Sequence, residues 1–162
     1  DAAGTFPRLI DMGVNADILG AAITTAMAQR LVRRLCPKCR ESRVMTPEEI
    51  KTMAPLLANI PHPEDLPANK EVMWVAKGCP ACGNTGYKGR IAVVEVILMD
   101  KEIEETIRKT SSERDLWHAA RHQKIRRMAQ DGAVKVLQGV TSLDELGRVV
   151  DLHDEVMLET IS

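Results

Sequence analysis

The chain has 162 residues, of which 44% are hydrophobic and 28% charged, and these values are ordinary for a globular protein. Its net charge of −1 gives no overall attraction to nucleic acid or to an acidic membrane surface. No apolar run approaches the roughly 18 residues that a spanning helix requires, and no signal-peptide pattern opens the chain. We therefore expect a reducing compartment, which disfavours structural disulfides. Because the chain starts with Asp1 rather than Met, we expect a fragment of a longer protein.

The N-terminal third of the sequence predicts helices. A short helix is expected at 6–13. Asn15 is the expected N-cap of a longer helix that runs to about Leu35, because apolar residues recur there every three or four positions. Thr46-Pro-Glu-Glu is a capping box, and the helix that it starts should run to about Ala54, where Pro55 ends or kinks it.

Two strands are predicted next, at 71–76 and 91–99. The second is apolar on both faces except at Glu95, which we expect to meet an arginine rather than to act in catalysis. Ser112 and Thr141 are the expected N-caps of two later helices, and Gly139 is an expected C-terminal stop. The predicted helices after Asp100 cover about 101–109, 112–123, 125–138 and 142–150.

All four cysteines lie in two C-P-x-C pairs, Cys36 with Cys39 and Cys79 with Cys82. Such pairs could form two disulfides, two dithiol switches, or the two halves of one metal site. A thioredoxin-type dithiol belongs between a strand and a helix N-terminus that lowers the thiol pKa. Here the first pair follows the end of a predicted helix, and the second is followed by helix-breaking glycines. The sequence therefore disfavours redox chemistry.

One metal site explains both pairs. Each C-x-x-C turn points two sulfur atoms at one ion, and four thiolates close a tetrahedral zinc site of the structural kind. Residues 40–78 separate the pairs, which is a longer loop than usual. Doubling the length of a loop raises its entropic closure cost by only about 0.6 kcal/mol, whereas zinc binding to a structural site contributes roughly 10–16 kcal/mol of apparent free energy. Iron in the rubredoxin manner also fits the spacing, and unpaired buried cysteines would explain neither the pairing nor the glycines. We predict one zinc ion per chain, bound by Cys36, Cys39, Cys79 and Cys82. The predicted fold class is α+β: a helix-rich domain with a small antiparallel sheet and an inserted tetracysteine zinc-binding element.

Three other patterns are weaker. His118 and His122 lie four apart on a predicted helix and could grip a metal, but a solvated helix face is the simpler interpretation. The glycine-rich stretch 83–89 fails the G-x-x-x-x-G-K-[ST] phosphate-loop pattern, because Lys88 occupies the place of the second glycine. A cluster of arginines near 30–34 could bind phosphate or an acidic partner, although charges at a helix end are the better explanation. These arginines are Arg30, Arg33 and Arg34.

Four blocks of the sequence together resemble one family, the hexameric ATPases of type II secretion and type IV pilus assembly. The first block, DAAGTFPRLIDMGV at 1–14, is similar to the segment after that family's histidine-containing box. The second, AQRLVRRLCPKC at 28–39, resembles a helix that runs into the first cysteine pair. The third and fourth resemble the second cysteine pair with its following strand and the closing helices; they read GCPACGNTGYKGR at 78–90 and MAQDGAVKVLQGVTSLDELGRV at 128–149.

The resemblance implies a parent protein that is a cytoplasmic, ATP-driven motor, peripheral at the inner face of the inner membrane. Its implied partners are the neighbouring subunits of a homohexameric ring and an inner-membrane platform protein. ATP and magnesium would bind only in the full-length parent, because the family's Walker A, Walker B, Asp-box and His-box motifs would lie before Asp1 or end at it. No catalytic or nucleotide-binding residue is therefore expected in 1–162. The tetracysteine element is similar to that of secretion and pilus-extension members, whereas pilus-retraction members lack it.

The resemblance also implies a division of the chain. Residues 1–35 would be the C-terminal helical part of the motor domain, 36–99 the tetracysteine zinc-binding element with the small sheet, and 100–162 a C-terminal helical bundle and tail. The tail at 151–162 matches nothing in the family. The alternative is a free-standing zinc-ribbon module that binds nucleic acid or protein. A nucleic-acid module needs a basic face with aromatic side chains, and the near-neutral charge and four scattered aromatics do not favour it; no nucleic-acid partner is expected.

The lack of a Walker A pattern gives the first prediction. Isolated residues 1–162 should show no ATP turnover and no saturable MgATP binding at sub-millimolar concentration, measured by titration calorimetry. Specific binding of MgATP would mean that this interpretation misplaces the nucleotide site.

Overall fold

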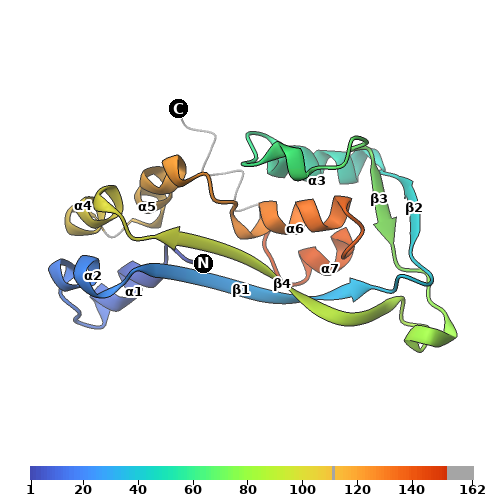
Figure 1. The fold of residues 1–162 in the computed structure, drawn as a ribbon, viewed down its shortest axis with the longest axis horizontal. Coiled ribbons are helices and arrows are strands. Elements are labelled where there is room, and N and C mark those ends of the chain that lie inside the picture. The colour runs from blue at the N-terminus through green and yellow to red at the C-terminus, as the bar shows by residue number, and fades with distance from the viewer. Residues whose placement is uncertain (111, 153–162) are drawn as a thin grey trace. The chain divides into compact units, whose positions relative to one another are not determined.

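A computed structural model describes residues 1–110 and 112–152 of the chain (Figure 1). These residues form two compact units, one from Asp1–Gln29 with Val94–Arg127 and one from Arg30–Val93 with the described residues from Met128 onward. The elements are α1 (Thr5–Asp11), α2 (Ala16–Ala22), β1 (Thr25–Leu35), β2 (Glu41–Val44), α3 (Pro47–Leu57), η1 (Pro63–Asp65), β3 (Val72–Val75), η2 (Pro80–Cys82), β4 (Tyr87–Leu98), α4 (Lys101–Lys109), α5 (Glu113–Ala120), η3 (Arg121–Gln123), α6 (Met128–Leu137) and α7 (Leu143–Gly147).

The strands form two small sheets. β1 pairs with β4, and Figure 1 shows these two long strands running in opposite directions. β2 pairs with β3 in antiparallel register, with Glu41 opposite Val75 and Val44 opposite Val72. Helices around two-stranded antiparallel sheets make the fold α+β, so the predicted fold class is confirmed.

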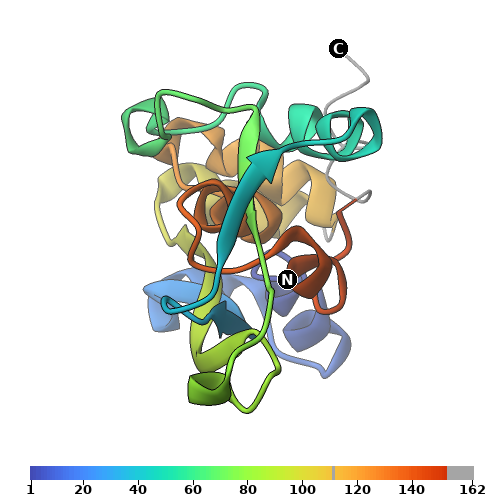
Figure 2. The same ribbon diagram turned by 90° about the vertical axis from the view of Figure 1, so that its right-hand side faces the viewer.

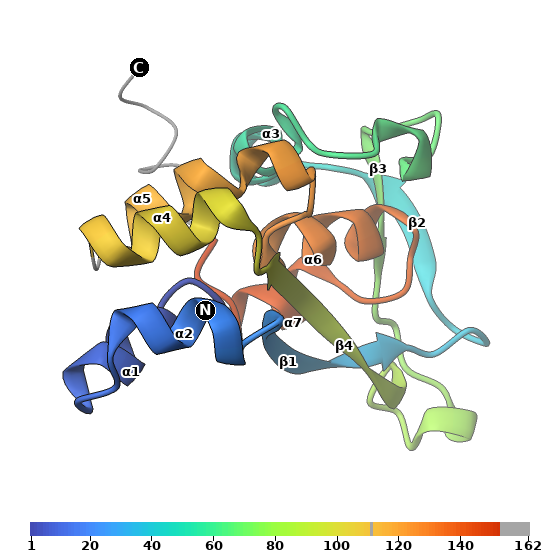
Figure 3. The ribbon, with the colours of Figure 1, turned by 60° about the vertical axis from the view of Figure 1, so that its left-hand side comes forward.

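The unit built from the N-terminus and residues 94–127 packs short amphipathic helices on one another. α4 contacts both α2 and α5, and Figure 3 shows α4 and α5 side by side. Local chemistry sets the helix starts: Asn15 and Ser112 accept N–H bonds at the beginnings of α2 and α5, as predicted. Fully buried Phe6, Ile103 and Leu116 lie in its core. Glu95 is also buried there, and its Oε1 accepts a 2.6 Å hydrogen bond from the N–H of Ala2.

The predicted helix to Leu35 is wrong in its second half. α2 ends at Ala22, and the chain re-emerges as strand β1 from Thr25. Pairing with β4 outweighs the local three-to-four spacing of apolar residues, because a strand can bury its backbone polar groups only through such a partner. The first cysteine pair therefore follows a strand rather than a helix. The thioredoxin context is still missing, since β2, not a helix, comes after that pair.

The other unit is organised around α6, which contacts α3, β3 and α7. Figure 2 views β2 and β3 in front of this helix. The buried side chains of this unit are largely aliphatic or methionine, as the scarcity of aromatic residues suggests. They include Met45, Met53 and Met73. The capping box of Thr46 and Glu49 starts α3 as predicted.

Two local predictions in this unit need correction, and one strand was missed. Pro55 lies inside α3, which continues to Leu57. The N-cap of α7 is Ser142, whose Oγ accepts from the N–H of Glu145 at 3.2 Å, and not Thr141. The Thr141 hydroxyl instead donates to the carbonyl of Arg33 at 2.8 Å. β2 was not predicted at all, because four exposed and mostly polar residues carry no alternating pattern.

The contact between α6 and α7 gives a stability prediction. A Cβ on Gly132 would lie 2.3 Å from Cδ1 of Leu146, a fully buried side chain. Gly132→Ala should therefore lower the free energy of unfolding by about 1–3 kcal/mol, even though alanine favours a helix by up to about 1 kcal/mol. Urea titration measures this loss.

Gly147→Ala is the matched control. The added methyl there meets only Cδ1 of Leu152, at an ordinary 3.6 Å. This variant should lose no stability. An unchanged unfolding midpoint for Gly132→Ala would show that α6 and α7 are not packed in this way.

Candidate metal centre

The four predicted cysteine ligands converge on one point. Their Sγ atoms all lie within 4.8 Å of one another. The closest pairs are Cys79–Cys82 at 3.7 Å, Cys39–Cys82 at 3.8 Å and Cys36–Cys79 at 3.9 Å. A disulfide needs about 2.05 Å, whereas four sulfurs at tetrahedral corners about 2.3 Å from one ion lie about 3.8 Å apart. The arrangement fits a tetrahedral ion held by four thiolates.

The first cysteine turn continues directly from β1. Buried Cys36 follows the last residue of that strand, and its carbonyl accepts N–H bonds from Cys39 at 3.2 Å and Arg40 at 2.9 Å. The N–H of Cys36 donates to the carbonyl of Gly86 at 2.8 Å. This last bond joins the first turn to the second.

The second cysteine turn wraps its sulfur atoms in backbone N–H groups. The carbonyl of Cys79 accepts from Cys82 at 3.1 Å and from Asn84 at 2.9 Å, and Gly83 has a φ of 59° that suits glycine. The Sγ of Cys82 accepts from the N–H of Cys79 at 3.3 Å and of Gly86 at 3.2 Å. Such bonds stabilise a thiolate, so this turn can present one to a metal ion.

The thiols differ sharply in acidity. Withdrawal from water opposes ionisation of Cys82, but the N–H groups of Cys79 and Gly86 outweigh it and lower the pKa of Cys82 to about 6. Withdrawal from water, only partly offset by the N–H of Gly78, raises the pKa of Cys39 to about 12. Thiolates packed this closely repel one another, so they cannot all ionise unless a cation compensates them. A divalent ion would supply that compensation, because it deprotonates the thiols that coordinate it.

An arginine, a tryptophan and a glycine support the first turn. The Arg40 guanidinium lies 4.5 Å above the Trp74 ring and donates to the carbonyl of Gly139. Gly139 ends α6 with a φ of 71°, and a Cβ there would lie 2.6 Å from Cδ1 of Trp74. The sequence identified Gly139 as a helix stop, but its second role beneath Trp74 depends on long-range packing that no local pattern indicates.

A part-buried ion pair holds β1 to α7 just before the cysteines. Arg33 donates to Glu145 through Nη2 at 2.5 Å, Nε at 2.9 Å and its backbone N–H at 3.0 Å. Its guanidinium also lies 4.1 Å from the centre of the Tyr87 ring, and the hydroxyls of Tyr87 and Ser142 are 2.7 Å apart. Hydrogen bonding from Arg33 lowers the pKa of Glu145, whose side chain is 7% exposed. Arg33 is therefore a structural residue rather than an anion-binding one.

The histidines do not form a second metal cluster in the part of the chain that the structure describes. The cysteines are the one group of three or more His, Cys, Asp or Glu side chains close enough there to hold an ion. His122 instead links Asp100 Oδ2, 2.9 Å from Nε2, to the carbonyl of Ala119, 2.7 Å from Nδ1. His122 thus contacts Asp100, the N-cap residue of α4, and this contact indicates a structural role rather than a metal-binding one.

Comparison with known proteins assigns the chain to a family. A family model described as type II/IV secretion system protein matches residues 1–148. The chain belongs to this family. It is 37% identical over 150 residues to type II secretion system protein E of Aeromonas hydrophila, 35% over 149 residues to type II secretion system protein HxcR of Pseudomonas aeruginosa, and 34% over 152 residues to type IV pilus assembly ATPase PilB of Thermus thermophilus.

The matches to these relatives cover 91%, 92% and 93% of the chain but only 27%, 26% and 16% of the relatives. The chain thus spans about a quarter or less of the secretion-family proteins that it resembles. The helices that the structure describes include none that is long and apolar enough to cross a membrane.

The Arg33–Glu145 pair gives a pH-dependent prediction. Glu145→Gln should lower the free energy of unfolding at neutral pH by about 1.5–3 kcal/mol, the value of a hydrogen bond to a charged group. Because the folded-state pKa of Glu145 is lowered, its stabilising effect is present above the unfolded-state pKa and is lost as pH falls through the folded-state value. The difference between wild type and variant should therefore shrink in acid, as measured by urea unfolding across pH.

Glu41→Gln is the control. Glu41 pairs with Lys77 at the surface, with side chains 54% and 62% exposed, and such pairs contribute less than about 1 kcal/mol. An equal loss for Glu145→Gln in acid and at neutral pH would show that Glu145 acts by shape rather than by charge.

Proposed function

We propose that the chain is the C-terminal zinc-binding part of a hexameric cytoplasmic ATPase that powers type II secretion or type IV pilus assembly. The observation that carries the proposal is the set of four Sγ atoms, all within 4.8 Å of one another, in a chain of this family. Within the parent, residues 1–35 would complete the motor domain, 36–99 would form the zinc element, and 100–162 would form the closing helices and tail.

The donor set favours zinc. Four thiolates are soft ligands, which select zinc or iron–sulfur chemistry over magnesium or calcium. Cys36, Cys39, Cys79 and Cys82 would hold the ion, and four protein ligands leave no position for a reacting water. The ion would fasten the end of β1 to the turn before β4 and so enclose residues 40–78. Its role is structural rather than catalytic.

The rest of the proposed role follows from the family. The name of the Thermus thermophilus relative describes an ATPase for pilus assembly. In the parent, ATP and magnesium would bind upstream of this chain. This part would brace the motor and present a surface to neighbouring subunits and to an inner-membrane platform protein, at the inner face of that membrane. No observation favours the alternative of a free-standing zinc ribbon that binds nucleic acid.

The test of the motor role uses the full-length protein that contains this chain. We expect it to hydrolyse MgATP and to give a hexameric mass in light scattering, whereas residues 1–162 alone should be a monomer or weak dimer because they would carry only part of the ring contacts. A full-length protein that neither binds nor hydrolyses MgATP would overturn the proposal. A salt-resistant hexamer of 1–162 would show that these residues alone close the ring.

The metal prediction concerns Cys79→Ser. Metal-replete protein should contain one zinc per chain with about 2.3 Å Zn–S distances, measured by elemental analysis and X-ray absorption. Removing one thiolate should weaken zinc affinity by orders of magnitude. Since binding to the folded state adds to stability, it should also lower the melting temperature.

Ala81→Ser is the matched control, because it changes an exposed residue of the same turn and leaves every sulfur in place. This variant should keep wild-type zinc content. Reduced, metal-supplied wild type without bound metal would contradict the site. Unchanged melting after both metal removal and Cys79→Ser would contradict its structural role.

A further inference from the structure

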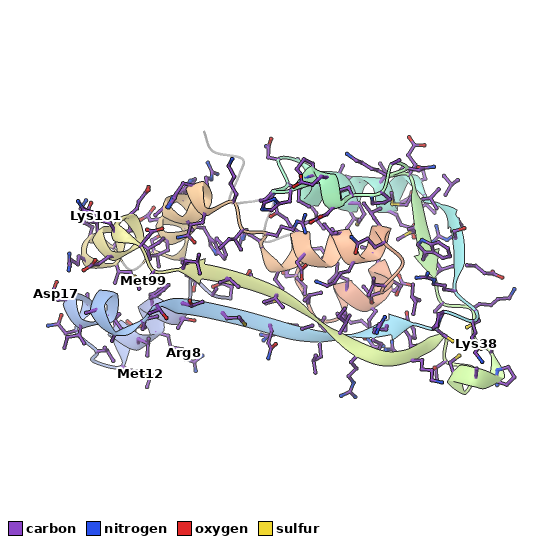
Figure 4. All side chains as sticks on the ribbon, viewed as in Figure 1. Arg8, Met12, Asp17, Lys38, Met99 and Lys101 are labelled. Atoms are coloured by element: carbon purple, nitrogen blue, oxygen red, sulfur yellow. The ribbon has the colours of Figure 1, made fainter. Side chains whose placement is uncertain are left out.

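The loop end of the β1–β4 ribbon carries an unusual concentration of positive charge. Residues 34–40 and 76–90 include six Lys or Arg and no Asp or Glu, although the whole chain has a net charge of −1. Figure 4 shows Lys38 at this end, in the first cysteine turn. The six residues are Arg34, Lys38, Arg40, Lys77, Lys88 and Arg90.

Two of the six have partners within the fold. Arg40 lies on Trp74 and donates to Gly139, and Lys77 forms a salt bridge with Glu41. The other four are exposed and form no salt bridge in the part of the chain that the structure describes. We call these four the basic tip: Arg34, Lys38, Lys88 and Arg90.

The basic tip is compact. Arg34 is two residues before Cys36, and Lys88 is two residues after Gly86, whose carbonyl bonds to the N–H of Cys36. At about 3.3 Å of rise per strand residue, each of these two lies within about 7 Å of that hydrogen bond along its strand, and Arg90 lies within about 14 Å. Lys88 and Arg90 are two apart at the beginning of β4, on either side of Gly89, whose φ is 81°. Lys38 lies within the first cysteine turn, between Cys36 and Cys39, so all four charges flank the two cysteine turns and can act on one extended ligand.

Neutralising the cysteine cluster does not use up this charge. Four thiolates around a divalent ion carry a net charge of −2, which is smaller than the six positive charges of the two segments. Arg40 lies next to Cys39, whereas the charge of Lys77, two residues before Cys79, is already offset by Glu41. The basic tip remains as an excess of positive charge at the surface.

We infer that the basic tip is a docking surface for an acidic polypeptide segment of another protein. Guanidinium groups pair with carboxylates in a bidentate manner, and two of the four tip residues are arginines. Membrane-surface sites usually add inserted apolar or aromatic side chains to their cations. The exposed large hydrophobic residues of the described chain all lie outside 34–40 and 76–90, so the basic tip offers none for insertion into a bilayer. The inference goes beyond the motor role and stands without it.

The experiment measures binding of a short, fluorescently labelled oligo-glutamate peptide to metal-replete protein. The tip variant combines Arg34→Gln, Lys38→Gln, Lys88→Gln and Arg90→Gln. Each lost exposed charge pair is worth about 0.2–1 kcal/mol, so the loss of four pairs should lower the affinity by about fourfold or more. Raising the ionic strength to about 1 M, where the Debye length is about 3 Å, should abolish wild-type binding.

The control variant removes the same charges elsewhere. It carries Arg8→Gln, Lys51→Gln, Lys70→Gln and Arg121→Gln, four exposed cations that form no salt bridge in the described structure. Because both variants lose two arginines and two lysines, they have equal net charge. The control should bind the peptide within about twofold of wild type, a change below about 0.5 kcal/mol. Zinc content and thermal melting show that both variants are folded.

Three outcomes would overturn the inference. The first is equal peptide affinity for wild type and tip variant, or equal losses in the tip and control variants. The second is tip-dependent co-sedimentation with phosphatidylglycerol–phosphatidylcholine vesicles, which would assign the surface to a membrane. The third is tip-dependent binding of short double-stranded DNA that is tighter than binding of the peptide, which would assign it to nucleic acid. None of these readouts depends on ATP turnover, so failure here is distinct from failure of the motor proposal.

Discussion

The hydrogen bond between the N–H of Cys36 and the carbonyl of Gly86 is the point on which the arrangement of the cysteine-bearing unit depends. It joins the end of β1 to the beginning of β4 and so brings two cysteine turns together that are separated by residues 40–78. That excursion contains β2, α3 and β3, and it has two further attachments near the turns. Lys77 pairs with Glu41, and Arg40 stacks on Trp74. A metal ion held by the four sulfurs would strengthen a closure that the backbone already defines.

The C-terminal helices are attached to the same end of β1. The N–H of Leu35 donates to the carbonyl of Val140 at 2.9 Å, and the Thr141 hydroxyl donates to the carbonyl of Arg33. Arg33 also holds Glu145 at the start of α7. Residues 33–36 thus bind the α6–α7 connection on one side and the second cysteine turn on the other. Disrupting the cysteine turns should therefore also weaken the packing of α7, because residues 33–36 contact both the second cysteine turn and the α6–α7 connection.

Features set by neighbouring residues could be predicted from the sequence. The caps at Asn15, Ser112 and Thr46 depend on side chains that bond to N–H groups two or three positions away, and all three are present. The convergence of the cysteines could be predicted from ligand chemistry, because the four thiolates of two C-x-x-C turns match one tetrahedral site. The contacts that orient the site could not be predicted in this way. Trp74 over Gly139 joins positions that only the folded chain brings together.

The error over residues 25–35 changes how the arginines are understood. In a helix, Arg33 and Arg34 would both have been charges at a helix end, with no reason to differ. In strand β1, successive side chains point to opposite faces. Arg33 accordingly pairs with the mostly buried Glu145, while Arg34 is exposed without a salt bridge in the described chain. Lys88 follows Tyr87 on β4 in the same way: Tyr87 lies under the Arg33 guanidinium, and Lys88 is exposed. The alternation of the two strands thus separates cations that hold the fold together from cations that remain available to a partner.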